Sequence, residues 1–568
     1  MTVRRHRVAP ATRALQLLEA QRGQFGAAVE RHRYRLLRQL DRATLASAPV
    51  VRRLHEALCQ VLTYPDSLRV HRLAARILAS FDQRTDLRRH ARALAGSGIA
   101  GTDIPFRFFA PTALWLAQRW PRRLVYDWPV WDDPSRLQEA LSLLAVHGES
   151  PGLDVWDLGL RGWLERMKPA SMGDAAFVLR RLAGRIGDPF VFERLVDGMD
   201  APMVLRAGRD TPSRSCGVRV PRRPVCQRVA LSRQWPDLVA ELARRPAVRA
   251  VPVREGRQLI ELALGTMMTH ERDLDVFSYG DPRDVRLVDC GEGLQFVAIG
   301  ALPERRLLLE SVYGFLTLRN GVPTGYLLTS ALYGSAEVAF NVFDTFRGFE
   351  AARTYARVLA MTRRLFGAEA FTVFPYQLGG AGNDEGLDSG AWWFYRRLGF
   401  APRHRTARSL MRREEMRRAR DPAYRSSRRT LEQLAQHNMY WHAGRPRADV
   451  MGVIPLANVG LAVSDFLARH GGGDPDRGAA GCVREARRLL GAGPGHGWTV
   501  GERLAFERWA PLVLLLPGVS RWPAVDRAAL VRVIRAKGGR RESGFVTAFD
   551  SHTRLRTAIA TLARTTRP

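Results

Sequence analysis

Hydrophobic residues recur at helical spacing through the first two hundred positions of the chain. In the stretch 51–62 they repeat every three or four residues, as on one face of an amphipathic helix: Val51, Leu54, Leu58, Val61 and Leu62. Further along, Asp133 and Pro134 open another segment in the way that helices often begin, with an N-cap acid followed by proline. We therefore predict a helical domain over 1–205.

The pattern changes after a stretch rich in Pro, Gly, Ser and Arg, which we interpret as a linker or irregular connection over 206–254. Two strand-like runs then lie in 285–302 about a Gly-Glu-Gly turn. The next segment, 312–332, contains Asn-Gly at 320–321, the strongest short hairpin signal, between β-rich flanks. These runs predict neighbouring strands of one sheet.

The segment 336–343 alternates in the manner of a half-buried strand. One face of this strand carries Val338, Phe340 and Val342. The other face carries Glu337, Ala339 and Asn341. A helix ending at Gly367, a short strand over 370–376 and a short helix ending in Leu-Gly-Phe follow. A further helix is expected before the strands, over 255–271.

Beyond 402 the pattern is helical again, with an Arg-rich connector over 413–442 and a C-terminal helical domain over 443–568. The predicted fold class is α+β: a central mixed sheet with helices, over 255–412, between N-terminal and C-terminal all-helical domains.

The charge is strongly positive, with a formal net value of +32 from 88 basic and 56 acidic residues. Such a value is typical of nucleic-acid binders. Only two of the basic residues are lysines, however, Lys168 and Lys537, and arginine with so little lysine indicates a coding bias spread over the surface. We therefore do not expect specific nucleic-acid binding. The stretch 402–429, with eleven arginines against three acids (11 − 3 = +8), is either a solvated connector or a docking face for an acidic partner.

Cysteine usage and hydropathy predict a cytoplasmic protein without a membrane span. The five cysteines are scattered and contain no Cys-x-x-Cys pair, which fits a reducing compartment. The most apolar run, 509–519, is far shorter than the ~20 residues that a span needs. His437 and His442 are five apart, which misses the spacing of a helical metal pair, so we expect no metal.

Two sequence blocks in the middle of the chain resemble those of the GNAT N-acyltransferase superfamily, over about 280–412. The first has the register of the family's V-x-P-x-x-R-G-x-G-x-G/A loop, and runs Val342-Phe343-Asp344-Thr345-Phe346-Arg347-Gly348-Phe349-Glu350-Ala351-Ala352. The second matches N-x-x-A-x-x-F-Y-x-x-L-G-F, and runs Asp388-Ser389-Gly390-Ala391-Trp392-Trp393-Phe394-Tyr395-Arg396-Arg397-Leu398-Gly399-Phe400.

The resemblance implies an N-acyltransferase that uses acetyl-CoA or another acyl-CoA as donor, with an acceptor amine that the sequence does not identify. Backbone amides at the start of the helix would hold the pyrophosphate, because a helix N-terminus attracts anions. The residues implied in donor binding are Val342, Phe343, Arg347, Gly348, Phe349, Ala351 and Ala352. Tyr395 would be the general acid for the departing thiolate. Candidate bases for the amine are Glu337, which we favour, Asp344 and Glu385.

This chain departs from the family pattern at several positions. Glu350 stands where the phosphate loop has glycine, and its replacement by glycine is expected to tighten donor binding by about tenfold. Asp388 replaces the asparagine that opens the second block, and no helix pair for the acceptor lies between the first strands and the hairpin. The loop 376–390 is a candidate cover for the acceptor site. Two alternatives therefore stay open: an acyl carrier protein as donor, or a catalytically silent scaffold or sensor.

Overall fold

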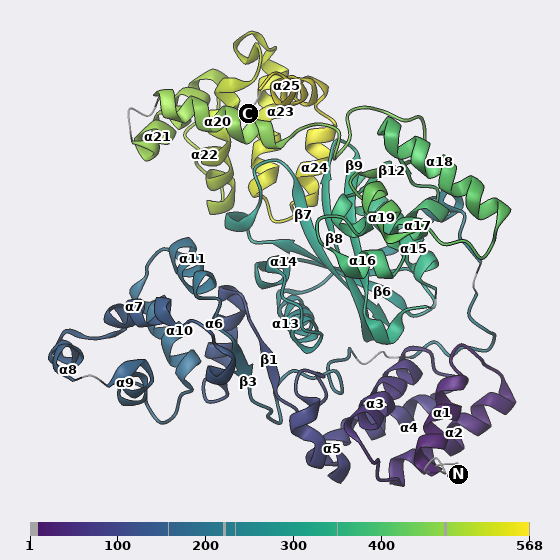
Figure 1. Cartoon of the computed structure of the whole chain (residues 1–568). Coiled ribbons are helices and arrows are strands. Elements are labelled where there is room, and N and C mark those ends of the chain that lie inside the picture. The colour runs from purple at the N-terminus through teal and green to yellow at the C-terminus, as the bar shows by residue number, and fades with distance from the viewer. Residues whose placement is uncertain are drawn as a thin grey trace.

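The computed structural model describes residues 10–156, 158–219, 223–232, 234–348, 350–470 and 474–566. Within these ranges a nine-stranded sheet lies at the centre, with N-terminal helices on one side of it and C-terminal helices at another (Figure 1). The strand order is β11-β12-β10-β9-β8-β7-β6-β5-β4. The strands are β4 (Ala247–Ala250), β5 (Gly280–Asp289), β6 (Leu294–Ala301), β7 (Ser311–Arg319), β8 (Val322–Leu332), β9 (Ser335–Val342), β10 (Ala370–Val373), β11 (Ala401–Pro402) and β12 (Met439–His442). The fold is thus mixed α+β.

The predicted hairpins are confirmed. Strands β4 to β9 pair antiparallel with their neighbours in chain order. The turn between β7 and β8 is the predicted Asn320-Gly321, and both residues have positive φ, 48° and 79°. A two-residue turn of this kind matches the right-handed twist of the strands, which is why Asn-Gly marks hairpins so well.

The pair β9 and β10 is parallel and is joined through helix α15 (Ala351–Phe366). The two strands are paired only from Ser335 to Glu337 on β9 and from Ala370 to Thr372 on β10. Beyond Glu337 strand β9 continues to Val342, whereas β10 ends and its chain turns into a short 3-10 helix, η7 (Pro375–Leu378). Among the described residues, the edge of β9 over 338–342 therefore has no strand partner on the β10 side, although the carbonyl of Val342 accepts a hydrogen bond from Arg347 Nε (3.1 Å).

The two faces of the sheet are covered by different helices. One face packs against α15 and α17 (Ala391–Arg397), together with α24 (Ser543–Asp550) of the C-terminal region. The other face carries α13 (Val253–Thr269) and α14 (Asp275–Ser278). Successive side chains of a strand point to opposite faces of the sheet. Because helices cover both faces, the central strands carry largely apolar side chains on both.

The N-terminal region forms two lobes (Figure 1). The helices of the first lobe are α1 (Pro10–Ala20), α2 (Ala27–Arg42), α3 (Ala48–Thr63), α4 (Leu68–Ala79) and α5 (Thr85–His90). The second contains α6 (Ala110–Arg119), α7 (Ser135–Leu144), α8 (Ser150–Val155), α9 (Gly159–Met167), α10 (Asp174–Arg185) and α11 (Pro189–Met199). The second lobe also has a small sheet of β1 (Ile104–Phe106), β2 (Leu124–Tyr126) and β3 (Met203–Leu205) in the order β1-β3-β2. The prediction of an all-helical region was therefore wrong here, because strands of three residues are too short to show a period.

The central sheet extends beyond the predicted limits of 255 and 412. Strand β4, followed along the chain by α13 and preceded by α12 (Leu238–Leu242), comes from the predicted linker. Strand β12 comes from the end of the predicted Arg-rich connector, after α18 (Arg405–Arg420) and α19 (Arg428–Leu434), and lies between β10 and β11. Both corrections concern four-residue strands whose place depends on partners far away in the chain.

The C-terminal region is helical where the structure describes it. Its helices are α20 (Ala457–His470), α21 (Pro475–Leu490), α22 (Val500–Leu515), α23 (Ala524–Gly538), α24 and α25 (Thr553–Thr565). The short helix α16 (Asp384–Asp388) lies within the loop predicted to cover the acceptor site. In the described part of the chain, no helix has both the length and the apolar character needed to cross a bilayer.

Candidate functional site

A cleft of about 520 Å³ lies over strands β7, β8 and β9, on the face of the sheet that carries α14. Glu337 of β9 points into it, opposite Ser330 of β8 in the strand register and beside Ala339. Glu337 thus lies at the last paired position of the parallel strands, where β9 and β10 diverge. The alternation seen in the sequence places it on this face, as predicted.

The environment of Glu337 raises its pKa to about 7. Burial in the cleft is the larger cause, because it disfavours the charged carboxylate, and the nearby carboxylate of Glu310 adds to the shift. Among the described residues, neither carboxylate has a hydrogen-bonding or ion-pairing partner. A carboxylate with a pKa near neutrality can both accept and release a proton at physiological pH.

The C-terminal region builds the remaining walls of this cleft. The segment 450–457 crosses the sheet, where Met451 accepts a hydrogen bond from Thr372 Oγ1 (2.8 Å) and donates one to Ser335 Oγ (2.9 Å). Helix α23 contributes the buried Lys537, whose Nζ donates to the backbone carbonyls of Leu309 (3.3 Å) and Glu310 (2.8 Å). The position of Glu310 therefore depends on a residue more than two hundred positions later.

Tyr395 lies on the opposite face of the sheet. Its ring is buried and contacts Tyr355 of α15 edge-on, with 5.3 Å between ring centres, and Tyr355 in turn contacts Phe340 of β9. Burial raises the pKa of the Tyr395 hydroxyl well above its usual range, so the hydroxyl is protonated at neutral pH. Tyr395 and Glu337 therefore approach strand β9 from its two faces and do not meet on one.

Trp392 and Trp393, which lie near Tyr395 on α17, are buried. The aromatic run thus packs one face of a short helix into the core. Arg418 of α18 lies over the ring of Trp393, 4.4 Å from its centre, and joins the Arg-rich helix to this core.

The loop between β9 and α15 is open at Gly348. This residue has a φ of 92°, a conformation that glycine adopts freely, and a Cβ built on it would have nothing within 4 Å. Ala351 and Ala352 form the first turn of α15, and no described side chain caps that helix. Phe349, implied as a further donor-binding residue, lies outside the described residues. The accessible backbone and the N-terminal end of α15 suit an anion.

Glu350 does not occupy this loop with its carboxylate. Its side chain is buried and pairs with Arg319 of β7 at 2.9 Å, and more distantly with Arg353 at 3.5 Å. Glu350 itself takes a left-handed conformation, with a φ of 50°. The carboxylate is therefore drawn away from the helix start, and the conflict with phosphate that the sequence suggested is relieved by an arginine that it did not indicate.

Val342 and Phe343 serve the packing of the strand. Val342 pairs with Gly325 of β8, and the Phe343 N–H donates to the carbonyl of Thr324 (3.0 Å). The Phe343 ring stacks on His270 with 3.6 Å between ring centres. The N–H of Phe343 is thus already used within the protein.

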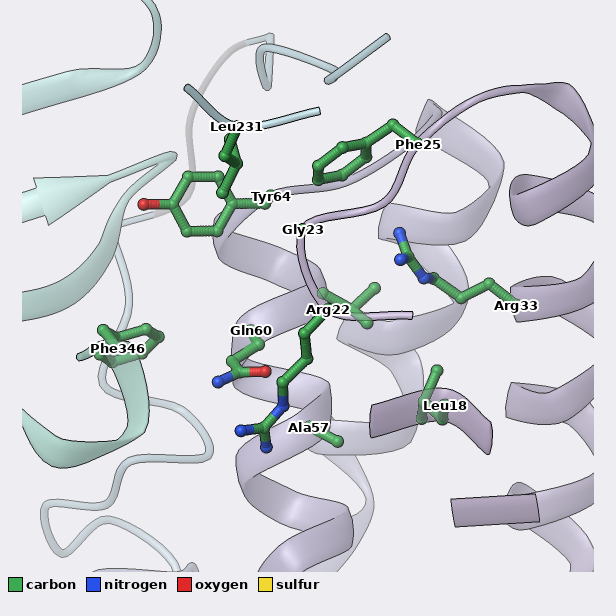
Figure 2. Close-up of a pocket in the computed structure, with 11 residues that line it drawn as sticks. Leu18, Arg22, Gly23, Phe25, Arg33, Ala57, Gln60, Tyr64, Leu231 and Phe346 are labelled. Carbon is green, nitrogen blue, oxygen red and sulfur yellow. The ribbon is translucent and has the colours of Figure 1, made fainter. Parts of the chain in front are cut away.

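The N-terminal lobe packs directly on the loop after β9. Figure 2 shows Phe346 of this loop on the side of Gln60, in α3, and of Tyr64, the residue that follows α3. Gln60 Nε2 donates to the carbonyl of Thr345, and Arg214 donates to its hydroxyl at 2.7 Å. The pocket that Phe346, Gln60 and Tyr64 line together with residues of the N-terminal lobe is about 40 Å³, enough for a water molecule but too small for a cofactor. This contact fixes the loop in place.

The other two candidate bases are engaged in ion pairs. Arg347, an exposed residue, pairs with Asp344 at 2.9 Å and with Glu385 of α16. Glu385 also pairs with Arg272, at 3.4 Å. These pairs link the end of β9 to the loop 376–390, and they leave Glu337 as the carboxylate best suited to take a proton.

The two histidines considered as a metal pair contact other residues. His437 stacks on His404 with 3.9 Å between ring centres, and His442 lies 3.0 Å from Arg403 Nη2. Within the described ranges, no group of three or more His, Cys, Asp or Glu side chains is arranged to hold a metal ion.

Sequence reasoning missed the residues that complete the cleft: Glu310, Lys537 and the segment 450–457. The sequence contains only two lysines, and this rarity could have drawn attention to Lys537. In the structure Lys537 is buried. No protein-family model, curated protein or solved structure matches this chain.

Proposed function

We propose that this protein is an N-acyltransferase that transfers an acetyl or longer acyl group from acyl-CoA to an amine. The observation that carries the proposal is the position of Glu337. It lies in a cleft, has a pKa of about 7, and stands where the paired region of two parallel strands ends. A base with a pKa near the working pH is best suited to deprotonate an ammonium ion.

Other features around β9 support this proposal. The part of β9 that has no strand partner on the β10 side, over 338–341, offers backbone groups to an extended, amide-containing chain such as the pantetheine arm. Gly348 and the first turn of α15 suit the pyrophosphate, with Arg347 beside them. These features, together with the strand order and the two sequence blocks, support coenzyme A as the donor carrier.

In the proposed reaction, Glu337 accepts a proton from the acceptor ammonium ion, which gives a neutral amine. The amine nitrogen forms a bond to the thioester carbonyl carbon, and the carbon–sulfur bond breaks. The sulfur would have to lie where β9 and β10 diverge, because Tyr395 is on the other face of the sheet from Glu337. From there Tyr395 would donate its hydroxyl proton to the departing sulfur and regain a proton from the nitrogen, which becomes an amide. The products are an amide and the free thiol, and atoms and charges balance.

Binding of the donor is the first test, because it needs no knowledge of the acceptor. We expect calorimetric titration of the full chain with acetyl-CoA or palmitoyl-CoA to show saturable binding that Arg347→Ala weakens. Glu337→Gln should bind the donor as the wild type does, yet release free thiol about 10²-fold more slowly in the presence of an amine acceptor. Glu304→Gln, an exposed glutamate outside the cleft, is the matched control and should change neither quantity.

Two outcomes would favour the alternatives. If neither acyl-CoA binds but an acyl carrier protein delivers its acyl group, the donor is the carrier protein, an acidic partner that suits the exposed arginines of α18. If neither donor binds or reacts, the domain is a scaffold or sensor.

A further inference from the structure

The cleft around Glu337 has a combination of linings that specifies a class of ligand. Its walls are mostly apolar, and their larger side chains are Leu307, Leu328, Phe374, Met451, Ile454 and Leu456. Two carboxylates, Glu310 and Glu337, lie among them, and no arginine or lysine is found among the described residues that line the cleft. Its volume of about 520 Å³ is in the range of pockets that enclose small organic ligands.

The charged side chains that line this cleft are acidic, whereas the protein as a whole has a large positive net charge. The chain has a formal net charge of +32, and arginines pair with most of the acids that lie near the site, including Glu350, Asp344 and Glu385. Neither Glu310 nor Glu337, in contrast, has a side-chain hydrogen bond or ion pair in the described chain, although the charge of Lys537 acts on Glu310 from a distance. Glu337 in particular is a buried carboxylate whose charged form costs free energy, and a cation would offset that cost.

Both the carboxylates and the apolar wall of the cleft are anchored to the sheet. Lys537 holds the backbone at Glu310, directly before β7, and the register of β8 and β9 holds Glu337 opposite Ser330. The buried Met451, Ile454 and the nearby Leu456 belong to the segment that Thr372 and Ser335 anchor to the sheet. Leu307, half exposed, lies at the rim.

We infer that the cleft binds the acceptor and that the acceptor is a primary amine on an apolar body, such as an alkyl or arylalkyl amine. The ammonium group would lie between Glu310 and Glu337, and the apolar body would lie against the wall formed by 450–457. The role as acceptor rests on the proposed function, whereas the class of ligand rests on the cleft alone. Amines that also carry a carboxylate or phosphate would be excluded by repulsion from the two glutamates.

A series of straight-chain amines tests this inference directly. Butylamine, hexylamine and octylamine are titrated calorimetrically into the full-length protein without any acyl donor. We expect affinity to rise about fourfold per methylene, the increment for burying a CH₂ group in an apolar site. Hexanoate and 6-aminohexanoate, matched in length, should show no binding at concentrations that saturate hexylamine.

Matched variants separate the charge from the apolar wall. Glu310→Gln is expected to weaken hexylamine binding by about tenfold, the scale for losing a charged hydrogen-bond partner, while the gain per methylene remains. Glu304→Gln should leave binding unchanged. Ala339→Phe, which fills the cleft from β9, should abolish binding, and circular dichroism and the unfolding temperature check that this variant is folded.

The outcomes distinguish this inference from the proposed function. Affinity that does not depend on chain length, equal binding of hexanoate, or equal effects of Glu304→Gln and Glu310→Gln would overturn the inference. Acyl transfer that prefers amino acids or other anionic amines would also overturn it, and would leave the proposed function standing. Amine binding as expected, with no donor binding and no transfer, would support the amine site and contradict the acyltransferase.

Discussion

The ionisation of Glu337 makes a prediction that requires no substrate. Its pKa is raised to about 7 in the folded protein, against 4.5 for an ordinary glutamate. The protonated carboxyl contributes its full stability below about pH 4.5, and that stability is lost progressively until the pH has risen through about 7. The reason is that over this range the unfolded chain has released the proton of Glu337, whereas the folded chain still binds it. At 1.36 kcal/mol per pKa unit, the loss is about 3 kcal/mol.

The substitution Glu337→Gln removes the ionisable group but keeps the size of the side chain. We expect the variant and the wild type to differ little in their free energy of unfolding at pH 5, and the variant to be more stable by about 3 kcal/mol at pH 8. The measurement is the midpoint of denaturant unfolding at half-unit steps from pH 5 to pH 8, with Glu304→Gln carried through the same series.

The neighbouring carboxylate provides an internal check. Because Glu310 contributes to the raised pKa, Glu310→Gln should move the pH dependence of Glu337 towards lower pH and reduce its amplitude. A stability difference between Glu337→Gln and the wild type that is the same at pH 5 and pH 8 would refute the reasoning, since it would show that the carboxylate ionises normally in the folded chain.

Four further predictions concern other parts of the molecule. Tyr395→Phe should lower kcat by ~10²-fold or more with little change in donor affinity, as single-turnover and binding assays would show, and an unchanged kcat would make Tyr395 a packing residue only. Glu350→Gly should destabilise the fold by about 3 kcal/mol in denaturant unfolding, because it leaves the buried Arg319 unpaired. A tenfold gain in donor affinity, measured by calorimetry, would contradict the conclusion that Arg319 holds the Glu350 carboxylate away from the start of α15. Lys537→Met should cost about 3–5 kcal/mol in the same assay, because it leaves the buried Glu542 with only the more distant Arg306 (3.9 Å), and the double variant with Glu542→Leu should recover much of that loss. Binding to duplex DNA should be weak and fall steeply between 50 and 200 mM salt in anisotropy titrations, and a sequence preference that persists at physiological salt would contradict the assignment of the charge to composition.

The sequence by itself determined the features that depend on local geometry. Asn320-Gly321 marks its hairpin because both positions need positive φ, and Gly367 ends α15 with a φ of 69° for the same reason. Alternation over 336–343 was enough to place Glu337 on the polar side of its strand. These signals are carried by neighbours in the chain, where sterics and hydrogen bonding act over a few residues.

The tertiary structure decided which of those residues meet. Strand β12 lies in the sheet between β10 and β11. The segment 450–457 closes a cleft over strands that come more than a hundred residues earlier in the chain. Neither segment has a local sequence pattern that predicts what it packs against. The sequence alone suggested that Glu350 blocks an anion site, whereas in the fold Arg319 pairs with its carboxylate. The raised pKa of Glu337 likewise results from its burial and from the nearby Glu310. Burial and charge pairing depend on distances in space, and the packing of remote segments sets those distances.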